Sequence, residues 1–151
     1  MSSSFLWRRP ESCPAGLDLY LLAEGDVRGI ARAVSCHQEI AADGAASLGM
    51  LAEYEPSLER HGAWFYRRLF WECGAVGQVL YLEAEAIGAR ATGIGCFFDE
   101  PVHEVFGLAS ERYRSLYHFT FGGPVEDPRL RTWPAYPPRD EQSAPGRHSA
   151  P

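Results

Sequence analysis

The sequence predicts an α+β domain in which a small mixed sheet packs on a long, buried central helix. Strand-like and helix-like segments are mixed along the chain, which favours this class over an all-helical or all-strand fold. The longest helical pattern covers residues 63–89, and its part from 69 to 82 is apolar on nearly every face. A helix of that kind is expected to be covered on all sides, either at the centre of the domain or at a subunit interface.

Length and composition predict a single globular domain. The chain has 151 residues, of which 46% are hydrophobic and 13% aromatic. A chain of this size can bury a real core, and its composition excludes wholesale disorder. We expect a lead-in loop over residues 1–16, one domain over 17–138 and a disordered tail over 139–151, where Pro, Arg and Ser are frequent.

The elements before the long helix follow from apolar spacing and from breakers. Asp26 is a good helix N-cap, and Pro56 ends a strand-like run. Gly62 is a natural joint before the long helix. The expected elements are a strand (17–23), a helix (26–42), a strand (47–55) and a short helix (56–61).

The elements after the long helix are delimited in the same way. Gly88 is a plausible helix stop, and Asp99 can cap a short helix with Pro101 in its first turn. A Gly-Gly-Pro sequence at residues 122–124 closes the last strand. The expected elements are a strand (91–98), a short helix (100–106) and a strand (115–121).

The charge of the chain argues against a nucleic-acid partner. The formal net charge is −6 and the isoelectric point is near 5.3, whereas phosphate binding needs a basic face. No apolar run is long enough to span a bilayer, so we expect no membrane partner. The N-terminal residues lack the apolar stretch of a signal peptide, which predicts a cytoplasmic protein.

The four cysteines contain no closely spaced pair that would indicate a zinc site or a redox motif. Without a secretory signal, we expect all four to be free thiols that pack as small hydrophobic side chains. They are Cys13, Cys36, Cys73 and Cys96.

Several polar side chains could carry chemistry, and a plainer explanation is favoured for each. Cys36 and His37 are neighbours on a predicted helix, where adjacent side chains do not face each other. His103 and His118 have no third ligand at a usual metal spacing, so no metal site is predicted. A cluster of three acidic residues is explained by helix capping, and acid–base chemistry is the alternative. The three residues are Asp99, Glu100 and Glu104.

Gly74 and Gly77 lie inside the long helical pattern. Each costs about 1 kcal/mol of helix stability relative to Ala. We therefore expect something to approach the helix closely there, either another helix or a ligand.

The stretch from residue 70 to 98 carries a family resemblance. It contains, in this order, an acidic residue, Gly-Ala, an apolar helix, Ala-x-x-x-Gly and Gly-Ile-Gly-x-Phe. This order of features resembles the nitroreductase superfamily of FMN enzymes. Val79 stands where the family commonly has Asn. The resemblance extends more weakly over about residues 17–136, including the strand that ends in Gly-x-Pro. The matching positions are Glu72, Gly74, Ala75, Gln78, Leu80, Leu82, Ala84 and Gly88.

The resemblance implies FMN chemistry, with hydride passing from a nicotinamide donor, NAD(P)H, through the flavin to an organic acceptor. The nearest subgroup is that of the azoline dehydrogenases of modified-peptide pathways, the streptolysin-associated type. A turn at Glu72, Cys73 and Gly74 would present backbone N–H groups to the polar edge of the flavin ring. Arg129 or Arg131 would bind the FMN phosphate. No catalytic side chain is assigned.

The N-terminal end departs from the family pattern. Arg8-Arg9-Pro10-Glu11 does not match the Arg-rich segment that binds FMN in the family, and few residues precede Leu17. We therefore expect the chain to be the C-terminal portion of a longer protein. The resemblance implies a homodimer with FMN at the interface, acting on a peptide or a small organic substrate. The alternative is a non-catalytic docking subunit of a biosynthetic complex.

Overall fold

A three-stranded antiparallel sheet forms the centre of the fold. The computed structural model describes residues 5–108, 111–131, 133, 135 and 136. The strand order is β1-β3-β2, so that the last strand lies in the middle. The strands are β1 (Ala46–Glu53), β2 (Arg90–Ile94) and β3 (Tyr113–Gly122). The α+β class is confirmed, and every strand pair is antiparallel rather than mixed.

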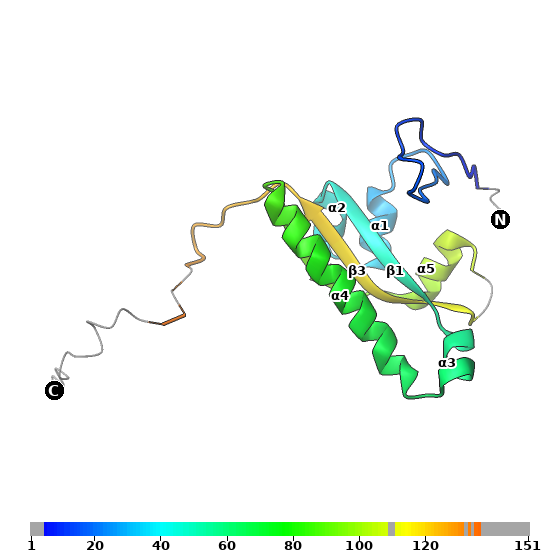
Figure 1. Cartoon of the computed structure of the whole chain (residues 1–151). Coiled ribbons are helices and arrows are strands. Elements are labelled where there is room, and N and C mark those ends of the chain that lie inside the picture. Colours follow the sequence, from blue (N-terminus) through cyan, green and yellow to red (C-terminus); the bar gives the residue numbers. More distant parts are fainter. Residues whose placement is uncertain (1–4, 109–110, 132, 134, 137–151) are drawn as a thin grey trace, which may run out of the picture.

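Five helices surround the sheet. Figure 1 shows the longest of them, α4, running beside β3. Side chains alternate along β3, so Tyr117 and Phe119 pack toward α4, whereas His118 and Thr120 point toward the segment that holds α1 and α2. The helices are α1 (Arg28–Val34), α2 (Ile40–Asp43), α3 (Glu55–His61), α4 (Phe65–Ala86) and α5 (Asp99–Phe106).

The second half of the predicted element order is confirmed. The strand expected at 47–55, the short helix before Gly62, the long helix, and the elements that follow it all occur at or near the expected bounds. Gly88 has a positive φ of 75°, which ends α4 as expected of a glycine stop. The strand expected at 91–98 is shorter, because the chain leaves the sheet after Ile94.

Two predictions for the first half are wrong. The segment 17–23 is not a strand of the sheet, because among the described residues it makes only an isolated bridge from Leu21 to Arg8. The helix expected at 26–42 is two helices, because Cys36 and His37 have positive φ angles of 53° and 57° and break it. The predicted tail at 139–151 lies outside the described residues.

Helix α4 buries one face only. Leu69, Gly77 and Ala84 are buried against the sheet. On the outer side, Trp71 is 61% exposed and Leu82 is 60% exposed. The expectation of all-round burial is therefore wrong for the single chain, because three strands and short helices cover only one side. No helix of the described ranges is long and apolar enough to cross a membrane.

Candidate functional site

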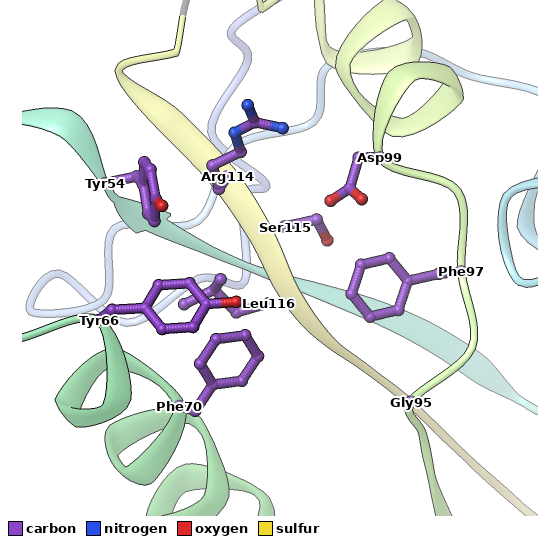
Figure 2. Close-up of a pocket in the computed structure, with 9 residues that line it drawn as sticks. All are labelled: Tyr54, Tyr66, Phe70, Gly95, Phe97, Asp99, Arg114, Ser115 and Leu116. Atoms are coloured by element: carbon purple, nitrogen blue, oxygen red, sulfur yellow. The ribbon is translucent and has the colours of Figure 1, made fainter.

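A cavity of about 370 Å³ opens at the end of the sheet next to α3 and α5. Four segments meet there: the residue after β1, the first turns of α4, the loop between β2 and α5, and the start of β3. Figure 2 shows their side chains around the cavity. The lining residues are Tyr54, Tyr66, Phe70, Gly95, Phe97, Asp99, Arg114, Ser115 and Leu116.

Aromatic rings form one wall of this cavity. Tyr54 and Tyr66 meet edge to face with ring centroids 6.0 Å apart, and Tyr66 meets Phe70 in the same way at 5.1 Å. Tyr66 and Phe70 keep 45% and 40% of their surface exposed. A concave site with aromatic walls and a few polar groups suits a planar conjugated ligand.

The loop between β2 and α5 offers free backbone donors. Within the described part of the chain, the amide groups of Gly95, Cys96 and Phe97 donate no hydrogen bond. The last amide of β2 that points away from β3 is that of Gly93, and it donates to the Tyr81 hydroxyl at 2.7 Å. A Cβ built on Gly95 meets nothing within 4 Å, so the backbone is open to a ligand there.

Two charged groups also line the cavity. The Arg114 guanidinium pairs with Glu111 and lies over the Tyr54 ring, 5.8 Å from its centroid. Asp99 begins α5 and points into the cavity in Figure 2. Arg114 therefore provides positive charge, and Asp99 negative charge, at the same opening.

A buried chain of three polar side chains lies beside the cavity. The His118 Nδ1 is 3.1 Å from the Ser35 Oγ, and its Nε2 is 3.0 Å from the Ser115 Oγ. The three residues are at most 3% exposed. The Phe97 ring stacks on the imidazole with centroids 4.4 Å apart. Burial lowers the pKa of His118, and the charge of Asp99 opposes this effect.

The spacing of His118 in the sequence suggests only a metal ligand and does not reveal its two serine partners. Ser115 and His118 are three apart on one strand, where simple alternation would put them on opposite faces. A β-bulge at Leu116, between the pairs Met50–Tyr117 and Leu51–Ser115, turns Ser115 to the face of His118. Neither the bulge nor Ser35, 83 positions away, is readable from spacing.

The free-thiol prediction is wrong for two cysteines. Cys36 and Cys96 form a disulfide, with Cα atoms 5.8 Å apart. Cysteine spacing in the sequence reveals only pairs that are close in the chain, whereas these two cysteines are 60 positions apart. They meet where the turn between α1 and α2 contacts the loop between β2 and α5. Among the described residues, Cys13 and Cys73 are the free thiols. Burial first, and then the charge of Glu72, raises the pKa of Cys73.

The structure does not bring the two predicted FMN-binding groups together. Glu72, Cys73 and Gly74 lie inside α4, so no turn exists there to present free amides. Glu72 and Cys73 line a separate groove between α4 and β1, and Gly74 faces open space. Arg129 pairs with Asp127 at 2.6 Å and follows the opposite end of β3. Figure 1 shows that this segment leaves the sheet away from α3 and α5.

The remaining candidates stay separate. Asp99 and Glu100 lie in the first turn of α5, where negative charge stabilises a helix, and Glu104 lies further along it and is exposed. The Nε2 atom of His103 is buried and has no hydrogen-bond partner among the residues that the structure describes. Arg131 is exposed. No group of three or more His, Cys, Asp or Glu side chains that could hold a metal ion occurs within the described ranges.

The fold and the cavity together define an α+β domain with an aromatic-walled cavity at one end of its sheet. The sequence profile described as "Nitroreductase family" matches residues 19–123. The chain therefore belongs to the nitroreductase family. A comparison with curated protein sequences finds no match.

Solved structures support the same fold. A proposed nitroreductase from Anabaena variabilis is 30% identical with a TM-score of 0.62, over 67% of this chain and 20% of that one. The NADPH:FMN oxidoreductase from Vibrio harveyi is 20% identical with a TM-score of 0.56, over 72% and 50%. The E. coli microcin synthetase McbBCD complex contains a chain 21% identical with a TM-score of 0.61, over 73% and 42%. The chain thus spans between a fifth and a half of these relatives.

Proposed function

We propose that this chain forms part of an FMN-dependent oxidoreductase and that the flavin ring lies in the cavity of Figure 2. The observation that carries the proposal is the row of unpaired amides at residues 95–97 beside aromatic walls. Such donors stabilise the negative charge that a flavin ring gains on reduction. The open space at Gly95 leaves room for a ring against the backbone.

The residues present fit FMN, which when bound supplies the hydride chemistry. Tyr66 and Phe70 offer flat apolar surface, and the amides of the cavity loop offer donors at the ring edge. Arg114 places a guanidinium at the opening, where an anionic group would be favoured. The described chain thereby orients the ring and excludes water from one side of it.

The electron donor and acceptor follow from the family. We propose one of two reactions. In the first, NAD(P)H donates hydride to the flavin and an organic molecule accepts it. In the second, the azoline ring of a modified peptide donates hydride to the flavin and is itself oxidised. The Vibrio neighbour, an NADPH:FMN oxidoreductase, supports the first, and the microcin synthetase neighbour, which has truncated pro-MccB17 bound, supports the second. A cytoplasmic location stays a prediction.

The FMN contacts expected from the sequence remain as the competing placement. In that placement the ring lies against α4 near Glu72, Cys73 and Gly74, and the phosphate meets Arg129 or Arg131. The groove between β1 and α4 supports it, since Glu72 and Cys73 line that groove. The ends of β3 are about 30 Å apart, so one flavin does not reach both the cavity of Figure 2 and the segment after β3 within a single chain.

Three glycines make a matched test, because a Cβ at each meets nothing within 4 Å. They are Gly95 in the cavity loop, Gly74 on α4 and Gly123 beyond β3. We expect Gly95→Val to abolish FMN binding, measured by quenching of flavin fluorescence, and to leave the melting temperature nearly unchanged. Gly74→Val and Gly123→Val should bind FMN as the wild type does. Loss of binding in Gly74→Val with Gly95→Val intact would instead place the flavin on α4.

A homodimer is the assembly we propose. The outer face of α4 carries exposed Trp71, Val79 and Leu82, and an apolar surface of this kind marks an interaction site. A second copy packing on this face would cover it.

A non-catalytic docking subunit is the second candidate function. The same exposed face favours it, and so does the microcin synthetase neighbour, which is itself a complex. A wild-type chain that binds no FMN but joins a larger assembly through α4 would identify it.

A further inference from the structure

The Ser35–His118–Ser115 chain determines where its protons lie. Ser35 is fully buried, and His118 Nδ1 is the only side-chain partner of its hydroxyl within the described structure. A hydroxyl group is both a donor and an acceptor, whereas a neutral imidazole has one nitrogen of each kind. The direction of each hydrogen bond can therefore be assigned by asking which arrangement leaves the unpaired hydroxyl proton at the cavity and not in the closed interior.

Each tautomer leaves one hydroxyl proton without a partner in the chain, and only one of them leaves that proton at the cavity. If Nδ1 of His118 accepts from the Ser35 hydroxyl, the proton of the ring is on Nε2 and is donated to the Ser115 Oγ. The Ser115 hydroxyl proton is then left over, at the wall of the cavity. The other tautomer would leave the Ser35 proton unpaired in the interior, at a cost of about 1–3 kcal/mol.

The surroundings hold the imidazole in this neutral form. Phe97 stacks on one face of the ring, nearly parallel at 6°. Asp99 is the charged group that acts on His118, and burial outweighs it, so the pKa of His118 is lowered. A neutral ring keeps one accepting nitrogen, which the assignment requires.

We propose that Ser115 is a ligand-binding residue: its hydroxyl, oriented by the Nε2–H tautomer of His118, donates a hydrogen bond into the cavity to an acceptor atom on the edge of the flavin ring. His118 and Ser35 are positioning residues that act through Ser115. The β-bulge at Leu116 is the device that aims Ser115 at both the imidazole and the cavity. The contact between Ser115 and the flavin rests on the proposed placement of FMN in the cavity, whereas the assignment of the His118 tautomer is independent of it.

The tautomer is tested on the chain without FMN by ¹⁵N NMR of labelled histidine, with His118→Gln identifying the His118 signals. We expect Nε2 to carry the proton and Nδ1 to be the accepting nitrogen near neutral pH. Ser35→Ala removes the donor to Nδ1 and should increase the Nδ1–H population. Ser115→Ala should leave the Nε2–H tautomer in place. A wild-type chain with the proton on Nδ1 overturns the assignment.

The ligand contact is tested by FMN titration. We expect Ser115→Ala to weaken FMN binding about tenfold, the effect of one lost hydrogen bond. Ser57→Ala is the matched control, because Ser57 lines the other groove, and it should bind FMN as the wild type does. Equal affinity for Ser115→Ala and the wild type overturns the contact. A wild type that binds no FMN overturns the proposed function and this contact together, while the NMR result still decides the tautomer.

Discussion

Tyr117 shows how a single side chain depends on two glycines. Its ring lies between α4 and β2, where a Cβ on Gly77 would come within 2.8 Å of the ring and a Cβ on Gly93 within 1.7 Å of the hydroxyl. A close approach to α4 therefore exists at Gly77, as expected, but the neighbour is a side chain of β3 and not another helix or a ligand. At Gly74 nothing lies within 4 Å.

This difference predicts opposite effects for two Gly→Ala changes on one helix. Gly77→Ala should lower the free energy of unfolding by about 1–3 kcal/mol, because Tyr117 cannot retreat from the new methyl group past Gly93. Gly74→Ala should raise it by up to about 1 kcal/mol, because Ala favours the helix and meets no neighbour. Urea unfolding measures both. A neutral Gly77→Ala would show that Tyr117 is not held between the two glycines.

Side-chain partners were less predictable from the sequence than backbone stops. Gly88 was readable as the end of α4, because a glycine after an apolar helical run has a simple conformational meaning. The pairing of His118 with Ser115 was not readable, because it depends on a bulge that shifts the strand register. The cavity itself combines residues from four segments, and no local pattern brings these together.

The link between the α1–α2 turn and the cavity loop is the main feature at the scale of elements. Besides the disulfide, the Phe98 amide donates to the Val34 carbonyl at 2.9 Å, and the Gln38 side chain donates to the Cys96 carbonyl at 3.1 Å. The turn therefore holds the loop that carries the free amides. The same constraint explains why the helix expected over 26–42 is broken.

The disulfide predicts the result of cysteine labelling. In denaturant without reductant, iodoacetamide should modify Cys13 and Cys73 but not Cys36 or Cys96, and after reduction it should modify all four. In the native protein at neutral pH, Cys73 should react slowly, because its raised pKa leaves little thiolate. Mass spectrometry counts the modifications. Labelling of all four cysteines without reductant would contradict the pairing.

Elements with strong periodicity were predictable, whereas the N-terminal segment was not. The runs that became α4, β1 and β3 pair or pack along most of their length, so their patterns reflect real burial. The segment 17–23 has a similar alternation, but it pairs only with the N-terminal segment near Arg8. Apolar alternation indicates that one face of a segment can be buried, but it does not indicate that a neighbouring strand is available to pair with it.

At the scale of the whole molecule, the uncovered face of α4 is the dominant feature. The sequence predicts a helix that is apolar on most sides, and in the single chain only one of those sides is covered. The apolar pattern shows only that surface must be buried somewhere. It does not distinguish burial inside one chain from burial between chains.

The exposed apolar face of α4 predicts a dimer, and a charged side chain introduced on this face should dissociate it. Val79→Glu or Leu82→Glu should convert the wild-type dimer to a monomer with an unchanged fold, because both side chains are more than half exposed in the single chain. Val125→Glu is the control, since Val125 is 93% exposed and lies beyond β3. Size-exclusion chromatography with light scattering measures the mass. A wild type that is a stable monomer at micromolar concentration would rule out this assembly.

The strand order also governs when the chain can fold. β1 and β2 each pair only with β3, which is the last of the three to be synthesised. Until about residue 122 has left the ribosome, the two outer strands have no partner in the sheet, and the inner face of α4 has no β3 to pack against. The nascent chain therefore exposes its apolar segments through most of translation and forms its sheet in a late, long-range step, which is the situation in which a chain depends most on chaperones.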